Sequence, residues 1–282
     1  MTTAVATAPT RVTVTRPPSA LRLGLSRGLL ELRMFLRERD AVVFMFALPP
    51  TLLALLGSIF TNSFQGTGVT ASQVFAASMI AGGIASTTFV NLGIWIAAER
   101  DDGTLRRLRT VPMPPVAYLI GKIVLVVVTS VAEVAVLLTV GVVFFDLRLP
   151  ATAERWFTFG WVFVLATISC SLLGIAVSNL ARSARSAPAV VNLPFLVLEF
   201  ISGVFIMPIT ELPRRLLSVG SLFPLKWAAQ GFRSAFLPDS MTVHEVAGAW
   251  EQGRIALVLG AWCLGGLLLC LKTFRWGGRR DR

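Results

Sequence analysis

The sequence is poor in the residues that build catalytic and metal centres. It has one histidine, His244, and three cysteines, each of which lies inside a long apolar run. A metal centre needs several His, Cys or carboxylate ligands at close spacing, and the sequence contains no such motif. An odd number of apolar cysteines also argues against a disulfide framework. These absences disfavour a metalloenzyme and a disulfide-stabilised secreted domain.

Charged residues are also scarce. They make up 15% of the chain, whereas soluble domains carry roughly 25%. Hydrophobic residues make up 55%, and the mean hydropathy is +0.73. The net charge is +11, but the cations flank apolar runs instead of gathering in a basic patch. The expected partner is therefore a lipid bilayer, and not nucleic acid.

Six apolar runs reach the roughly 20 residues that a membrane span needs. Because lipid offers the backbone no hydrogen-bond partners, each run is expected to be helical. We therefore predict an all-α polytopic membrane protein with six transmembrane helices over residues 41–274. Gly82-Gly83 in the second run permits close helix approach. The six runs are Ala41–Phe60, Val74–Ala98, Leu119–Phe145, Trp156–Leu180, Pro188–Met207 and Ile255–Phe274.

The segments outside these runs have distinct patterns. Residues 1–20 are rich in Thr, Ala and Pro and are expected to be a disordered tail. Residues 21–40 predict an amphipathic helix, either interfacial in the headgroup layer or packed on a partner. Prolines break residues 210–237 into short pieces, which predicts re-entrant external helices between spans five and six. Residues 275–282 form a basic tail. The apolar stripe of the first helix is Leu21, Leu25, Leu29, Leu32 and Leu36.

Lysine and arginine are distributed unevenly among the connections. Nineteen of the 26 lie in the N-terminal segment, the C-terminal segment and the connections after runs two and four. Cytoplasmic loops carry an excess of these residues. We therefore predict a multi-pass protein of the cell membrane with both termini in the cytoplasm.

The connection between runs two and three, residues 99–117, predicts a short amphipathic helix. Gly103 suits the end of the membrane helix, and Thr104 can cap the next one. Leu105 and Leu108 fall on one side of that helix. A short rigid helix is suited to docking into a groove on another protein. A charged turn that follows the positive-inside bias is the alternative from the residues alone.

The same connection resembles the motif of type-2 ABC transporter permeases, the membrane subunits of ABC exporters. Their pattern is Glu-Arg-acid-x-Gly-Thr-Leu-Glu-x-Leu, followed by a Thr-Pro-rich turn and Tyr-Leu-x-Gly-Lys. Arg106 departs from it, since the family has an acid there. The matching residues are Glu99, Arg100, Asp101, Gly103, Thr104, Leu105, Leu108, Tyr118, Leu119, Gly121 and Lys122.

A second series, after run five, resembles the family's Ser-Gly-x-x-x-Pro, Leu-Pro and Asn-Pro-Leu-Thr motifs. Phe223 stands where the family has Asn, and Lys226 where it has Thr. By this resemblance the segment closes the outer end of the path. The external gate candidates are Ser202, Gly203, Pro208, Pro213 and Pro224.

The resemblance implies a division of labour. Two permease chains, identical or paralogous, pair around a central path, while cytosolic ATP-binding subunits hydrolyse ATP with Mg. This chain is expected to bind no cofactor, since Gly121-Lys122 lacks the upstream glycine of a P-loop. The residues expected to couple to the ATPase are Glu99, Arg100, Asp101, Gly103, Thr104, Leu105, Leu108, Arg182 and Arg185.

Two acids lie deep in apolar runs, Glu133 in the third and Glu199 in the fifth. A charge at the bilayer centre costs about 2.5–3.5 kcal/mol on insertion scales, so such an acid is usually protonated, paired or turned toward a cavity. Both are candidates for the translocation path, and position favours Glu199. A neutral acid hydrogen-bonded to a neighbouring helix is the alternative for each.

The favoured function is the permease subunit of an ATP-driven ABC exporter. Its cargo is expected to be a hydrophobic small molecule such as a drug or antibiotic, which implies efflux and antibiotic resistance. A lipid or polysaccharide exporter of the same family is an alternative. So is a proton-coupled secondary transporter, although the halves show no inverted repeat. A membrane-embedded enzyme is disfavoured by the lack of a polar catalytic cluster.

Overall fold

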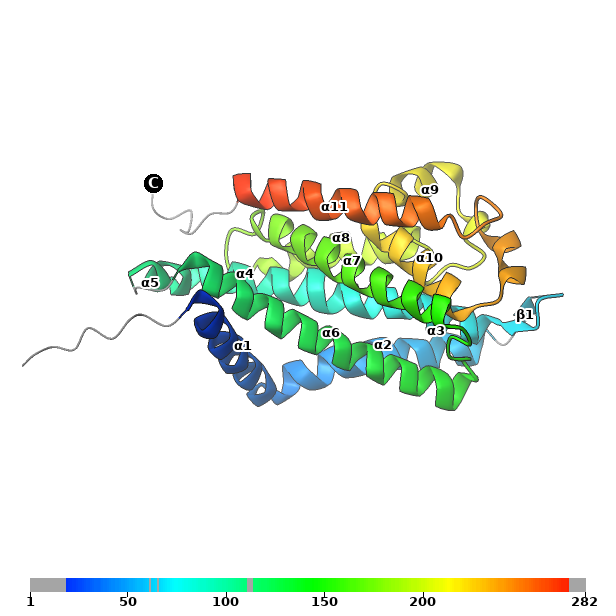
Figure 1. The fold of residues 1–282 in the computed structure, drawn as a ribbon, viewed down its shortest axis with the longest axis horizontal. Coiled ribbons are helices and arrows are strands. Elements are labelled where there is room, and N and C mark those ends of the chain that lie inside the picture. The colour runs from blue at the N-terminus through cyan, green and yellow to red at the C-terminus, as the bar shows by residue number, and fades with distance from the viewer. Residues whose placement is uncertain (1–18, 61, 65, 111–113, 274–282) are drawn as a thin grey trace, which may run out of the picture.

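The computed structural model describes residues 19–60, 62–64, 66–110 and 114–273 of the chain. Figure 1 shows long helices lying side by side along the long axis, with α5 (Thr104–Thr110) at one end and the strand β1 (Ser63–Phe64) at the other. These two ends are called the α5 end and the hairpin end below. The predictions for residues 1–18, for residues 111–113 of the connection 99–117 and for residues 274–282 lie outside the described residues.

Within the described residues, five helices are long and apolar enough to cross a membrane, so the chain is a polytopic membrane protein. They coincide with five of the six predicted runs. The second of them is continuous in space but is divided into three elements by its hydrogen bonding. The five helices are α2 (Arg39–Ile59), the composite of α3 (Ala71–Ala85), η1 (Ser86–Asn91) and α4 (Leu92–Asp101), α6 (Pro115–Phe145), α7 (Ala153–Ser178) and α11 (Gln252–Thr273).

The fifth predicted run forms a shorter helix than expected. Helix α8 (Ala187–Ile201) is apolar but ends well before the predicted Met207. The cause is the Ser202-Gly203 pair, where Gly203 has a φ of +71°. A glycine in this left-handed conformation is a common way to terminate a helix. Apolarity alone therefore overestimated the length of this element.

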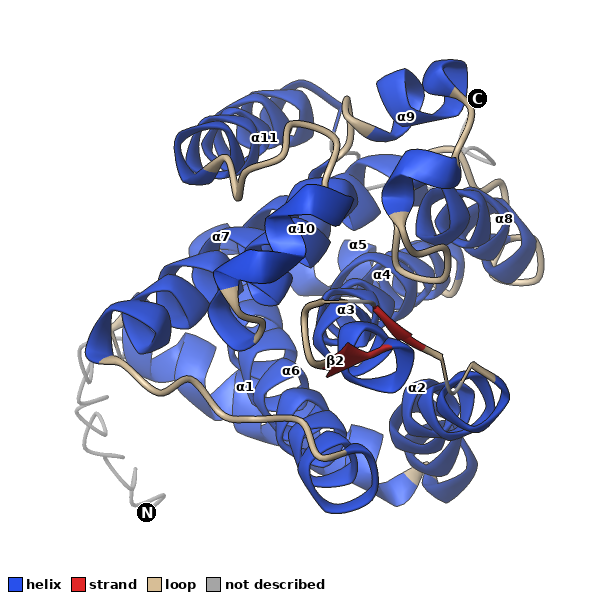
Figure 2. Ribbon diagram, turned by 90° about the vertical axis from the view of Figure 1, so that its right-hand side faces the viewer, coloured by secondary structure: helices blue, strands red, loops and turns tan. Residues whose placement is uncertain are grey.

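The composite helix α3–η1–α4 occupies the centre of the bundle. In its most apolar stretch 78% of the residues are buried, compared with 22–39% in the other four long helices. Figure 2, viewed from the hairpin end, shows α3 surrounded by α2, α6, α8 and α10 (Pro224–Phe236). The segment η1 is a π-helix, a rare form that is often found at functional sites. Within it Thr87 Oγ1 lies 3.0 Å from Ser130 Oγ of α6.

The predicted amphipathic N-terminal helix is present as α1 (Ala20–Arg37), and most of its leucine stripe is exposed. Leu21, Leu25 and Leu29 are exposed, whereas Gly24 and Gly28 are buried against α6. A Cβ added to either glycine would approach Ile120 or Val124 of α6 to within about 2.6 Å. Small residues therefore set the packing face of α1, and leucines remain available for contact with lipid.

Short helices connect the long ones at the hairpin end. Strand β1 pairs antiparallel with β2 (Val69–Thr70) before α3 begins. The predicted short helices between runs five and six are also present, and their position relative to the bilayer stays a prediction. Every residue of α10 is buried, and it packs on α3, α7 and α11. The other three elements of this connection are η2 (Ile209–Glu211), α9 (Arg214–Gly220) and η3 (Asp239–His244).

A fully buried arginine holds this connection in place. Arg233 of α10 donates from Nε to Glu245 Oε1 over 2.6 Å. Its Nη1 donates to Ser78 Oγ of α3 at 3.2 Å and to the Gly203 carbonyl at 3.1 Å. One guanidinium thus joins α10, the central helix, the end of α8 and the chain before α11. Charge-assisted hydrogen bonds of this kind are stronger than neutral ones.

We expect the substitution Arg233→Met to lower the free energy of unfolding by about 3–5 kcal/mol, since Glu245 is then left buried without its partner. Combining it with Glu245→Leu should restore most of the loss, because the buried charge is removed. Thermal unfolding of the purified protein, followed by tryptophan fluorescence, measures both. Arg254→Met, at an exposed ion pair with Glu251, is the matched control and should change little. An unchanged unfolding temperature for Arg233→Met contradicts this account.

Candidate functional site

The end of α4 carries the predicted coupling motif, and its first residue joins α4 to α6. The carboxylate of Glu99 accepts a hydrogen bond from the Tyr118 hydroxyl at 2.8 Å through Oε2. Its Oε1 accepts one from Lys122 Nζ at 2.7 Å. Both donors belong to the Tyr-Leu-x-Gly-Lys part of the motif. The two halves of the motif, separated by α5 in the sequence, are thus bonded to each other.

The same lysine extends the contact to α1. Lys122 Nζ lies 3.1 Å from Glu31 Oε2, and Glu31 Oε1 lies 2.9 Å from Arg27 Nε. Glu31, Tyr118 and Lys122 are all buried. We call this set the α4-end network: Arg27, Glu31, Glu99, Tyr118 and Lys122. Sequence reasoning missed Glu31, although it lies on the same helical face as Gly24 and Gly28.

The next two motif residues connect α4 to the other side of the bundle. Arg100 donates from Nη1 to the Ser178 carbonyl at 3.0 Å and from Nη2 to Ser178 Oγ at 3.3 Å, at the end of α7. Asp101 Oδ2 accepts from the backbone N–H of Ala184 at 2.9 Å. The loop of residues 182–187, which contains the expected coupling residues Arg182 and Arg185, is therefore bonded to the end of α4. Arg182 and Arg185 are exposed there.

The turn into α5 differs from its prediction in one respect. Asp102, and not Thr104, caps α5: its Oδ1 accepts from the Thr104 N–H at 2.8 Å, and Thr104 is the first helical residue. The expectation for Gly103 is confirmed, since it follows α4 with a φ of +77°. This conformation is costly for other L residues.

Helix α5 presents charge more than apolar surface. Leu105 has 0% exposure, so its side chain is not free to enter a groove on another protein, and Leu108 is half-buried. Arg106 and Arg107 are exposed on the same helix. The accessible surface at the α5 end is therefore basic, contributed by α5 and by residues 182–187.

The two intramembrane acids lie on either side of the Gly82-Gly83 pair of α3. A Cβ added to Gly82 would lie 2.8 Å from Glu199 Oε1, and one added to Gly83 would lie 3.0 Å from Glu133 Cγ. Gly82 therefore makes room for Glu199, and Gly83 makes room for Glu133 and for Leu137, whose Cδ1 would lie 2.7 Å from the added Cβ. The sequence predicted that helices approach closely at Gly82-Gly83. It did not predict that the side chains of Glu133 and Glu199 would lie against this pair.

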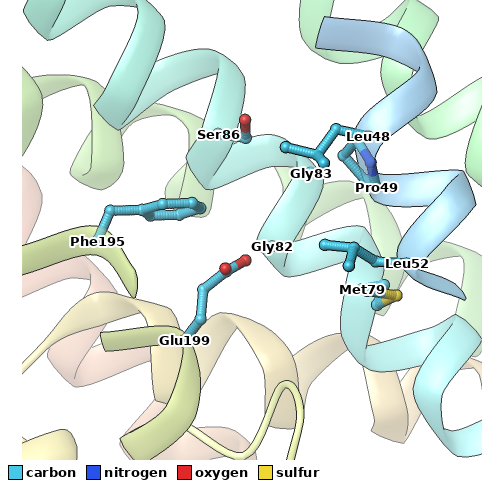
Figure 3. Close-up of a pocket in the computed structure, with 9 residues that line it drawn as sticks. All are labelled: Leu48, Pro49, Leu52, Met79, Gly82, Gly83, Ser86, Phe195 and Glu199. Carbon is cyan, nitrogen blue, oxygen red and sulfur yellow. The ribbon is translucent and has the colours of Figure 1, made fainter. Parts of the chain in front are cut away.

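The two acids differ in their surroundings. Glu199 is 8% exposed and lines a cavity of about 30 Å³, enough for one or two water molecules. Figure 3 shows its carboxylate directed toward Gly82 and into that space. Glu133 is 0% exposed and is not among the lining residues. The lining residues come from α2, the central helix and α8: Leu48, Pro49, Leu52, Met79, Gly82, Gly83, Ser86, Phe195 and Glu199.

The predicted external gate residues lie together at the hairpin end. Gly203 receives the Arg233 hydrogen bond, and Pro224 is the first residue of α10. Ser202 follows α8 and is fully buried. Pro208 precedes η2 and Pro213 precedes α9.

Lys226 of α10 is a second buried cation in this region. Its Nζ lies 4.1 Å from the centre of the Trp227 ring. Burial lowers the pKa of Lys226 from its ordinary value, and the nearby carboxylates Glu251 and Glu245 act in the opposite direction. The departure from the family's Thr at this position thus introduces a charge that the ring and the acids stabilise.

Comparison with known proteins agrees with this geometry. The family model described as "ABC-2 type transporter", of the ABC2_membrane domain, matches residues 29–237. The matched range extends from α1 through α10 and includes both glycine-flanking acids. The chain belongs to the ABC-2 type transporter membrane family. In this family the membrane domain lacks the ATP-binding domain, the ATPase activity lies in a partner, and permeases pair with ATP-binding subunits.

Two curated relatives carry the same kind of description. The chain is similar to "Putative transport permease ycf38" of Pyropia yezoensis, with 26% identity over 83% of this chain and 78% of the relative. It is also similar to "Putative transport permease YvfS" of Bacillus subtilis (strain 168), with 22% identity over 81% of this chain and 84% of the relative. Neither description names a substrate.

We expect Lys122→Met to release α1 from α6, because Glu31 and Glu99 then lose their shared buried cation. The cost of removing one partner from a buried ionic network is on the order of 3–5 kcal/mol. Limited trypsin digestion in detergent measures it, since cleavage at Arg33 should become faster once α1 detaches. Lys272→Met, at an exposed position near the end of α11, is the matched control. Equal cleavage rates in all three proteins would show that the network does not hold α1.

Proposed function

We propose that this chain is the permease subunit of an ATP-driven exporter and that α5 is its coupling helix. The observation that carries the proposal is the set of bonds at the end of α4. Glu99 contacts α6 and, through Lys122, α1, while Arg100 and Asp101 contact α7 and the loop before α8. A force applied to α5 is therefore distributed to the ends of several long helices at once.

The mechanism follows from that rigidity. Binding of ATP brings the two ATP-binding subunits together, and their movement shifts α5 of each permease. Since α5 is capped by Asp102 and bonded to the bundle through the preceding residues, it moves with the bundle and not as a free loop. The bundle then changes between inward-open and outward-open states as a rigid body.

The proposed topology has six spans, with α8 as the fifth, and both termini in the cytoplasm of the cell membrane. The excess of Lys and Arg at the α5 end supports this orientation. Helices α9 and α10 are then re-entrant external helices, and the Arg233 contacts hold α10 at the outer end. A second permease chain completes the path. The exposed apolar side chains of α2 and α8 give that chain, or lipid, a surface to contact.

The proposed cargo is a hydrophobic small molecule such as a drug or antibiotic. The lining of the cavity beside Glu199 is mostly apolar, with Leu48, Leu52, Met79 and Phe195. Such a surface favours apolar compounds over polysaccharides, which need many hydrogen-bonding partners. Of the two acids, Glu199 is the one we place on the path, because it lines the cavity.

We expect Arg107→Glu to reduce the amount of ATP-binding subunit that co-purifies with this chain at least about tenfold, since reversing an interface charge opposes association. Arg107 is suited to this test because it is exposed on α5 while Leu105 is not. The measurement is affinity purification from native membranes, identification of the partner by mass spectrometry and assay of ATP hydrolysis.

Arg148→Glu is the matched control for that experiment. Arg148 is also exposed, but it lies between α6 and α7 at the hairpin end, where no ATP-binding subunit is proposed to dock. It should leave the recovered ATPase unchanged. Equal recovery with Arg107→Glu and Arg148→Glu would exclude α5 as the docking element, and transport that persists without any ATPase would exclude the proposed function.

A further inference from the structure

We propose that the cavity beside Glu199 binds the protonated nitrogen of a lipophilic amine, with Glu199 as its counter-charge. This deepens the proposed function by naming a substrate class, and it rests on that function for the claim that the ligand is exported. The proposed ligand is an organic monocation with an apolar body. Glu199 is then the residue that determines specificity for charge.

The first argument is that the Glu199 carboxylate has no partner of its own. Among the residues that the structure describes, none forms a hydrogen bond or an ion pair with this carboxylate. It is 92% buried and is directed into the cavity (Figure 3). Buried carboxylates in proteins are paired as a rule, because an unpaired one is costly. A ligand cation supplies the missing partner.

The second argument is the chemistry of the surrounding wall. Phe195 lies one helical turn before Glu199 on α8, and its ring points into the same space (Figure 3). An aromatic face beside a carboxylate is a suitable pair for an ammonium group, through cation–π attraction and ion pairing. Most of the remaining wall is apolar, with Leu48, Leu52 and Met79, and Ser86 adds one hydroxyl group. Sugars and anions find few complementary groups there.

The third argument is the position of Leu48 of α2, which lines the cavity and also reaches the outer surface. Leu48 is 45% exposed, so the cavity wall continues onto the outer surface of the bundle. Phe44, Leu48, Leu52 and Leu55 recur at helical spacing on α2 and form an apolar stripe that passes the cavity. The apolar body of the ligand lies along this stripe while its nitrogen enters the cavity.

Glu133 provides an internal comparison. It flanks the same glycine pair and belongs to the same residue type, but it is fully enclosed and lines no part of this cavity. A ligand that enters between α2 and α8 reaches Glu199 and not Glu133. Loss of the charge at the two positions therefore has different consequences for binding.

The test uses the full chain in nanodiscs of zwitterionic lipid and two probes that differ in one group. Phenylbutylamine is protonated at pH 7, whereas phenylbutanol has a nearly identical shape without charge. Equilibrium dialysis against each probe, with empty nanodiscs subtracted, gives the two affinities. The variants are Glu199→Gln, Glu199→Asp and Glu133→Gln.

We expect the unmodified chain to bind the amine more tightly than the alcohol. Glu199→Gln should weaken amine binding by about tenfold or more, the usual effect of losing a charged hydrogen-bond partner, and leave alcohol binding unchanged. Glu199→Asp keeps the charge and should keep the preference for the amine. Glu133→Gln should behave as the unmodified chain does.

Two results overturn the proposal. One is equal affinity of the unmodified chain for the amine and the alcohol. This result does not depend on whether any variant folds. The other is full retention of amine binding in Glu199→Gln. Neither measurement involves ATP or a partner subunit. A failed Arg107 experiment would therefore contradict the proposed exporter function without contradicting amine binding at Glu199. A failed binding experiment would contradict amine binding and leave the exporter function standing.

Discussion

The burial of one helix on all sides is the constraint on which the rest of the structure depends. The composite helix from Ala71 to Asp101 is enclosed by its neighbours over most of its length, so most of its side chains have to fit against another helix. Small residues make this possible: Gly82 and Gly83 admit an acid each, and Gly93 faces the backbone of Gly174 on α7. Close packing of this kind replaces the hydrophobic effect, which does not act between helices in lipid.

Both candidate sites belong to that helix. The cavity adjoins its middle, and the coupling motif is its last turn and the residues that follow. Between them lies the π-helix η1, where the backbone has a wider turn and Thr87 contacts Ser130 of α6. Ligand binding near Gly82 and a force on α5 therefore act on one continuous helix. If both favour one of the same two conformations of that helix, thermodynamic linkage requires each of them to change the equilibrium of the other.

Hydropathy and charge predicted the helical membrane fold, five of the long helices and the place of the coupling motif. They did not predict which face of each helix is buried. On α1 the pattern predicted an amphipathic helix but did not show that Gly24 and Gly28, on the face beside the leucine stripe, pack against α6. Ion pairs such as that between Glu31 and Lys122 join segments that are far apart in the sequence. The periodicity of a single segment gives no information about such contacts. Helix α8 is short because of the backbone conformation of Gly203. Hydropathy averaged over a window of about 20 residues does not detect a single helix-terminating glycine.

The length of α8 has a consequence for the surrounding lipid. Its 15 residues extend about 22 Å at 1.5 Å per residue, whereas the hydrocarbon core is roughly 30 Å thick. The difference has to be met by local thinning of the bilayer or by irregular backbone shielded within protein. Thin membranes reduce this mismatch and thick, sterol-rich ones increase it. The thickness of the host bilayer therefore affects α8, the helix that carries Glu199.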